Sequence, residues 1–124
     1  MSGNSFFVDT NILLYLLSGN ETIAELLNEK QLYISFVTQL ELLGYKGISK
    51  QDLVLIEQMI DKCIVIDINQ SIKQIVINLR RKYKLKLPDA IIIASSIYYE
   101  QTIISADSDF KKVKELDLLY FESE

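Results

Sequence analysis

Short apolar strands alternate with helical segments along this chain, and that alternation most restricts the folds available to it. The strand-like runs are rich in β-branched and aromatic residues, whereas the segments between them place apolar residues three and four positions apart. Strands that alternate with helices form a parallel sheet with helices on both faces, so the sequence predicts an α/β fold. The expected strands are 6–8, 31–35, 63–68, 102–105 and 118–121, and the expected helices are 12–17, 21–28, 36–43, 49–59, 70–83 and 89–100, with a short helix opening at 109.

The composition indicates one globular domain and narrows its chemistry. A chain of 124 residues, of which 49% are hydrophobic, can build one full core, so we expect residues 1–124 to form a single domain. There is no histidine, which excludes Ser-His triads and the usual zinc ligands. The single cysteine, Cys63, excludes an internal disulfide and a multi-cysteine metal site. Any catalysis must therefore rest on carboxylates, hydroxyls, lysines or a metal held by oxygen.

The charge and hydropathy of the chain bear on whether it binds nucleic acid and whether it enters a membrane. The net charge of −4 argues against a strongly basic nucleic-acid-binding surface, but a cluster of metal-binding acids lowers the charge without excluding nucleic acid. The N-terminus has no basic region, and the longest apolar runs are too short to cross a bilayer. We therefore expect a cytoplasmic protein without a membrane segment.

Four acids from distant parts of the chain are expected to meet at one edge of the sheet. Asp9 directly follows the first strand, and Asp107 comes two residues after the strand 102–105. Asp89 opens a buried helix, and Glu41 lies one turn inside the helix that follows the second strand. In a parallel sheet the carboxyl ends of all strands point to the same edge, which is where ligand sites form.

Each acid, taken alone, also has a purely structural explanation. Asp9 can cap the following helix, and Asp89 can be a first-turn acid that the helix dipole favours. Asp107 can be a turn residue, and Glu41 can lie on the solvent face of its helix. A fifth acid, Asp67, also ends a strand, but the cap of the next helix explains it better.

A divalent cation would resolve the repulsion among acids brought together in this way. Clustered carboxylates raise one another's pKa values, whereas Mg²⁺ and Mn²⁺ prefer oxygen ligands, and Mg²⁺ accepts phosphate. Such an ion activates water and stabilises the charge on a phosphodiester during its hydrolysis. The acids therefore indicate metal-dependent hydrolysis as one chemistry that is open to a chain without histidine.

Three short segments and one glutamate, taken in their order along the chain, resemble the PIN domain family. Within that family they most resemble the small single-domain toxins of the VapC type. The resemblance covers essentially the entire chain. The segments that carry it are 8–11 (Val-Asp-Thr-Asn), Glu41, 87–94 (Leu-Pro-Asp-Ala-Ile-Ile-Ile-Ala) and 105–110 (Ser-Ala-Asp-Ser-Asp-Phe).

The resemblance implies a three-layer α/β/α sandwich with a central, mostly parallel sheet, and a Mg²⁺- or Mn²⁺-dependent endoribonuclease. It also implies a cognate antitoxin protein and a homodimer. The site residues that it implies are Asp9, Glu41, Asp89 and Asp107 as catalytic metal ligands, Asp109 as a further acid at the metal or a brace of the loop, Thr10 and Asn11 as groups that orient Asp9, and Ser105 as a hydrogen-bonding residue near the metal.

An RNA substrate needs basic side chains for its phosphates. Basic residues precede Asp89 and follow Asp107, although they can equally be solvated helix faces. The candidate RNA contacts are Arg80, Arg81, Lys84, Lys86 and Lys111.

Three other functions stay open at this point. A receiver-type signalling domain would use Asp67 as phosphoacceptor but needs adjacent acids after its first strand, where this chain has Thr10 and Asn11. A haloacid-dehalogenase-like phosphatase needs an aspartate at position 11. A non-catalytic domain that keeps the PIN fold and binds a partner protein is the third alternative.

Overall fold

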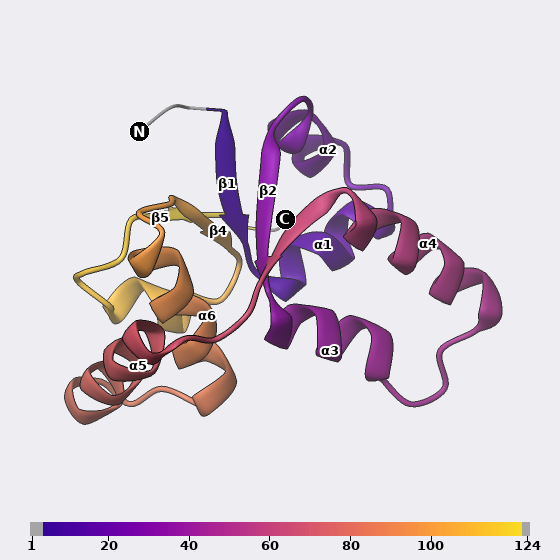
Figure 1. Ribbon diagram of the computed structural model, residues 1–124. Helices are drawn as coiled ribbons and strands as arrows, with labels where there is room; N and C mark the ends of the chain where they lie inside the picture. Colours follow the sequence, from indigo (N-terminus) through magenta and orange to yellow (C-terminus); the bar gives the residue numbers. More distant parts are fainter. Residues whose placement is uncertain (1–3, 123–124) are drawn as a thin grey trace.

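The computed structural model of the protein describes residues 4–122, and Figure 1 shows its helices and strands. Five strands and six α-helices alternate along this part of the chain, with one short 3₁₀ helix near its end. The strands are β1 (Ser5–Val8), β2 (Gln31–Ser35), β3 (Cys63–Ile66), β4 (Ile103–Ser105) and β5 (Leu118–Tyr120); the helices are α1 (Thr10–Leu17), α2 (Glu21–Leu27), α3 (Phe36–Gly44), α4 (Lys50–Asp61), α5 (Gln70–Lys82), α6 (Leu87–Tyr98) and the 3₁₀ helix η1 (Ser108–Lys112).

The five strands form one sheet in the order β3-β2-β1-β4-β5, and every pairing is parallel. The predicted parallel sheet is therefore confirmed. The chain builds outward from β1 through β2 and β3, and then returns to the other side of β1 to form β4 and β5. The carboxyl ends of β1 and β4 consequently lie side by side, with Val8 paired to Ile104. Ligand sites of open α/β sheets form at such a reversal of strand order.

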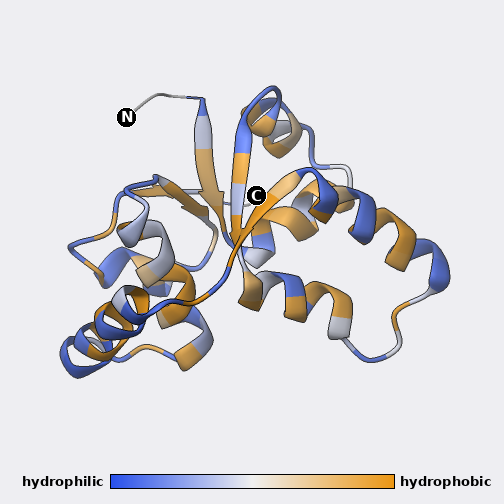
Figure 2. Ribbon diagram, in the orientation of Figure 1, coloured by the Kyte–Doolittle hydropathy of each residue, from blue (hydrophilic) through white to orange (hydrophobic). Residues whose placement is uncertain are grey.

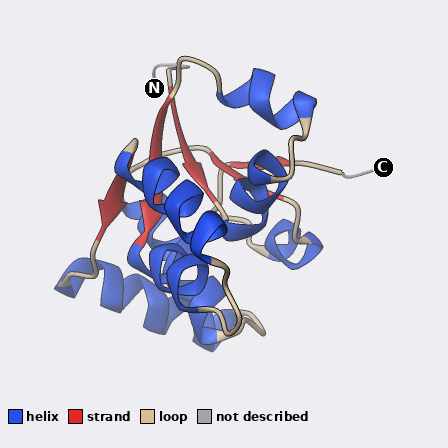
Figure 3. Cartoon of the chain, turned by 90° about the vertical axis from the view of Figure 1, so that its right-hand side faces the viewer, coloured by secondary structure: helices blue, strands red, loops and turns tan. Residues whose placement is uncertain are grey.

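Helices cover both faces of the sheet, so the expected three-layer sandwich is also confirmed. Successive strand residues point to opposite faces. Phe7 and Ile103 pack into a core with residues of α5, α6 and η1, whereas Val8 and Ile104 pack into a second core with residues of α1, α2 and α4. Figure 3 shows the strands between the two groups of helices, and Figure 2 shows that β3 is hydrophobic along its length.

The boundaries of several predicted elements differ from the structure near the acids. The helix expected to start at residue 12 starts at Thr10, directly after its cap Asp9, and the short helix expected to open at residue 109 starts at Ser108. The helix expected to start at Asp89 starts at Leu87, because Pro88 is compatible with the first turn of a helix. The strand expected to reach residue 68 ends at Ile66, which leaves Asp67 exposed. Asn69 caps α5 by accepting a hydrogen bond from the Ile72 amide.

No helix within residues 4–122 combines the length and apolar character that a membrane-spanning segment requires.

Candidate active site

Asp9 is the buried centre of the candidate site. It lies at the carboxyl end of β1, where it precedes α1 as its N-cap, and only 5% of its surface is exposed. One carboxylate oxygen accepts a hydrogen bond from the Thr10 amide at 2.8 Å, and the other accepts one from the Ser105 hydroxyl at 2.6 Å. Asp9 therefore caps its helix and also links β1 to the end of β4.

The pKa values show that several acids lie near one another. The pKa of Asp9 is raised to about 6, mainly by burial and less by the charges of Asp89 and Asp107, against the two hydrogen bonds that lower it. Burial also raises the pKa of Asp89, as do the charges of Asp107, Glu41 and Asp109, while Lys86 opposes them. The fold thus brings acids from four separate segments to one edge of the sheet.

Ser105 joins the two aspartates that follow β1 and β4. It is fully buried, donates to Asp9, and accepts a hydrogen bond from the Asp107 amide at 3.0 Å. Asp107 in turn accepts a hydrogen bond from the Asp109 amide at 2.9 Å and so caps η1. Asp107, which the sequence also allowed to be a turn residue, is thus the N-cap of η1, and its charge contributes to the raised pKa of Asp9 and of Asp89.

Glu41 is exposed on the solvent face of its helix, which was one of its two interpretations from the sequence, but a specific contact orients its side chain. The Thr10 hydroxyl donates to its carboxylate at 2.7 Å. The same hydroxyl lies 2.9 Å from the hydroxyl of Thr38, which is fully buried in α3. This chain of three side chains ties the first turn of α1 to the middle of α3, the two helices that follow β1 and β2 in Figure 1.

Two expected contacts are therefore wrong in detail. We expected the side chains of Thr10 and Asn11 to orient Asp9, but only the amide of Thr10 contacts it. The Thr10 hydroxyl holds Glu41, and the Asn11 side chain accepts a hydrogen bond from the Ala106 amide at 3.2 Å. The reason is geometric: both residues lie in the first turn of α1, which directs their side chains toward α3 and the loop after β4.

Thr38 is the residue that sequence reasoning missed. It is not the cap of α3, because Ser35 caps this helix by accepting a hydrogen bond from the Val37 amide. Thr38 lies three positions before Glu41, and residues three apart share one face of a helix. That spacing was the available signal.

The acids match a hard divalent cation in their donor chemistry, because each offers carboxylate oxygens and together they carry uncompensated negative charge. Their present arrangement does not close around an ion. Within residues 4–122, no group of three or more acidic or cysteine side chains is placed so that it could hold a metal. Binding would therefore require side-chain rotations, which the exposed Asp109 is free to make, whereas the Thr10 hydroxyl holds Glu41.

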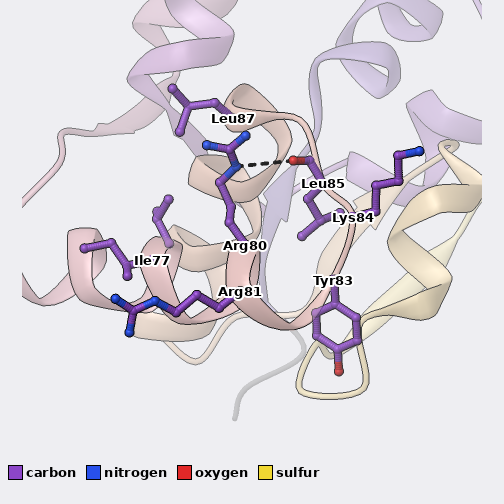
Figure 4. Close-up of a pocket in the computed structure, with 8 residues that line it drawn as sticks. Ile77, Arg80, Arg81, Tyr83, Lys84, Leu85 and Leu87 are labelled. Atoms are coloured by element: carbon purple, nitrogen blue, oxygen red, sulfur yellow. Dashed lines mark hydrogen bonds between the residues drawn. The ribbon is translucent and has the colours of Figure 1, made fainter.

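A basic cleft of about 520 Å³ lies beside Asp89 and Asp109. An adjoining pocket of about 510 Å³, shown in Figure 4, continues it past Tyr83 and Arg81. The Arg80 side chain lines both spaces and donates to the Leu85 carbonyl at 3.3 Å. The basic residues that line the cleft are Arg80, Lys84, Lys86 and Lys112.

Two of the five candidate RNA contacts lie outside this cleft. Arg81 lines only the adjoining pocket. The ammonium of Lys111 lies 3.9 Å from the centre of the Tyr120 ring and does not line the cleft, whereas its neighbour Lys112 does. Both lysines lie in the 3₁₀ helix η1, where adjacent residues point about 120° apart, so the two side chains leave the helix in different directions.

Known proteins share this fold and, to a lesser extent, this sequence. The family model described as PIN domain matches residues 6–116. A toxin-antitoxin complex from Klebsiella pneumoniae contains a chain 31% identical, with a TM-score of 0.77, over 90% of this chain and 94% of that one. No curated protein sequence gives a significant match.

Two further structures show the same fold at lower identity. The structure of VapBC2 from Rickettsia felis, bound to a DNA fragment from its promoter, matches at 17% identity with a TM-score of 0.84, over 95% of this chain and 99% of that one. VapBC-1 from nontypeable Haemophilus influenzae matches at 22% identity with a TM-score of 0.78, over 94% and 97% of the two chains.

Proposed function

Because the chain belongs to the PIN domain family, we propose that it is a divalent-metal-dependent endoribonuclease and the VapC-type toxin of a toxin–antitoxin pair. The observation that carries the proposal is the convergence of Asp9, Glu41, Asp89 and Asp107 at the edge where β1 and β4 end. Burial raises the pKa of Asp9 and of Asp89 most, and the charges of the neighbouring acids add to it, so a bound cation would stabilise the ionised carboxylates.

The residues have separable roles in this proposal. Asp9 would be the central ligand, because its buried carboxylate is held by Ser105 and the Thr10 amide. Glu41, Asp89 and Asp107 would complete the ligand set for Mg²⁺ or Mn²⁺, with Asp109 as a further acid at the cleft. The bound ion would supply an activated water and would offset charge on the phosphodiester.

The basic cleft supports RNA as the substrate. Asp89 and Asp109 line the cleft together with Leu85 and four basic side chains, so a phosphate backbone lying there would pass close to the acids. We assign the phosphate contacts to the four basic residues of the cleft, with Arg81 as an outer contact along the pocket of Figure 4. We do not include Lys111 among these contacts, because it does not line the cleft.

The proposed partners follow from the structural relatives. Several of these are complexes of a toxin with its antitoxin, and we propose that this chain likewise binds a cognate antitoxin protein. We also propose that it forms a homodimer, as the resemblance to VapC-type toxins implies. We also propose that it acts in the cytoplasm, where its RNA substrate would be. A receiver domain or a phosphatase is not supported, because the family match covers residues 6–116.

Cleavage of a cellular RNA pool tests the proposal. We expect the wild type to cut RNA with added Mg²⁺ or Mn²⁺ and to stop when EDTA is added, and we expect Asp9→Asn to be inactive. Asp67→Asn is the matched control, because Asp67 also follows a strand but lies at the edge strand β3, away from β1. Equal cleavage by wild type and Asp9→Asn, or the absence of cleavage by both, would favour the non-catalytic PIN-fold domain.

A further inference from the structure

The contact with Thr10 is what explains why a hydroxyl group is present at Thr38. It is fully buried in α3, and a buried hydroxyl needs a hydrogen-bond partner to offset the loss of water. The one side-chain hydrogen bond found for it in the described part of the chain is the 2.9 Å contact between its hydroxyl and that of Thr10. An apolar residue would otherwise suit this core position better.

The number of hydroxyl protons determines which group is the donor in each of these two hydrogen bonds. The Thr10 hydroxyl has one proton, and it lies within hydrogen-bond distance of both Glu41 and Thr38. Thr10 donates this proton to a carboxylate oxygen of Glu41. Thr38 must therefore be the donor to the Thr10 oxygen. The order runs from the core to the surface: Thr38 to Thr10, and Thr10 to Glu41.

We propose that Thr38 is a positioning residue that sets the orientation of Glu41 through the Thr10 hydroxyl before any ion binds. Glu41 is exposed, and an exposed glutamate has many rotamers that must be given up when it binds a ligand. A donor on the far side of Thr10 holds the Thr10 oxygen in place and leaves its proton pointing at Glu41. The ordering is thus built into α1 and α3, and less entropy is lost on binding.

The metal-binding consequence rests on the function proposed above, whereas the orientation of Glu41 can be tested without metal. Three-bond NMR couplings report the side-chain rotamers of Glu41 in the protein with EDTA. We expect one dominant rotamer in the wild type and in Thr38→Ser, which keeps the hydroxyl, but averaged couplings in Thr38→Val, which removes it. Unchanged couplings in Thr38→Val would overturn the proposal, whether or not the protein binds metal.

A Mn²⁺ titration followed by electron paramagnetic resonance tests the consequence. Residues behind metal ligands change affinity by about 10- to 100-fold, and Thr38 acts one contact further away, so we expect about fivefold weaker binding in Thr38→Val and about wild-type binding in Thr38→Ser. In a Glu41→Gln background, Thr38→Val should have no further effect. An equal loss in both backgrounds would show that Thr38 only fills the core and would overturn the role assigned to it.

The two proposals fail in different ways. If the wild type bound no Mn²⁺, the metal-dependent function would be wrong, while the couplings would still decide whether Thr38 orients Glu41. If the wild type bound Mn²⁺ and both Thr38 variants bound it equally well, the function would stand and the positioning role would fall.

Discussion

Single side chains determine how this protein responds to pH, and Asp9 is the clearest case. Its pKa is raised from 3.8 to about 6 when the protein folds, mainly by burial. The folded state therefore holds a proton that the unfolded state releases, so stability falls as pH rises from about 4 to about 6. At pH 7 the ionised, buried carboxylate costs up to about 3 kcal/mol of unfolding free energy.

Replacing Asp9 with asparagine should remove this cost in the metal-free protein. We expect Asp9→Asn to exceed the wild type in unfolding free energy by about 2 kcal/mol at pH 7, and the two to converge near pH 4. Urea unfolding in EDTA at several pH values measures the difference, with the exposed Asp67→Asn as a control. A difference that did not change with pH would contradict this account of Asp9.

Ser105 should matter both for stability and for the acids that it joins. Ser105→Ala leaves a carboxylate oxygen of Asp9 and the amide of Asp107 without their hydrogen-bond partner. We expect a loss of about 2 kcal/mol in unfolding free energy, and about tenfold weaker Mn²⁺ binding, because the partners of ligating groups tune metal affinity. Ser108→Ala changes an exposed hydroxyl and should alter neither quantity.

For individual helices and strands, α6 shows how the core supports the site. The helix carries Asp89 in its first turn and is buried along most of its length against α5 and the sheet. Ile93→Ala should therefore cost about 3 kcal/mol of unfolding free energy, whereas Ile77→Ala on α5, where the side chain is 44% exposed, should cost less than about 1 kcal/mol. Chemical denaturation compares the two, and similar losses would show that α6 is not the supporting core.

The elements also show what the sequence could and could not predict. The positions of Asp9 and Asp107 were predictable because strand polarity alone brings the carboxyl ends of parallel strands to one edge. The link from Thr10 to Glu41 was not, because it depends on how α1 and α3 pack, and no local pattern records that packing. The choice between Lys111 and Lys112 depends on the helical rotation of η1, which a basic run in a sequence does not specify.

The protein as a whole carries a net charge of −4, yet the proposed RNA path is basic, and the two facts together predict a steep salt dependence. Each phosphate neutralised on a single strand contributes about −0.7 to the slope of log affinity against log salt. The four basic residues of the cleft should therefore give a slope of about −3, which is about 50-fold weaker binding when salt rises from 50 to 200 mM.

Two neighbouring lysines make this prediction specific to the cleft. Lys112→Gln removes a charge that lines it, so the slope should become shallower by about 0.7, whereas Lys111→Gln removes an equal charge that lies against Tyr120 and should leave the slope unchanged. Fluorescence anisotropy with a labelled single-stranded RNA measures both, in an Asp9→Asn background with EDTA so that no RNA is cleaved. Because the two variants have the same net charge, equal slopes would mean that RNA responds to the overall charge of the protein. In that case the cleft beside Asp89 would not be the path of the substrate.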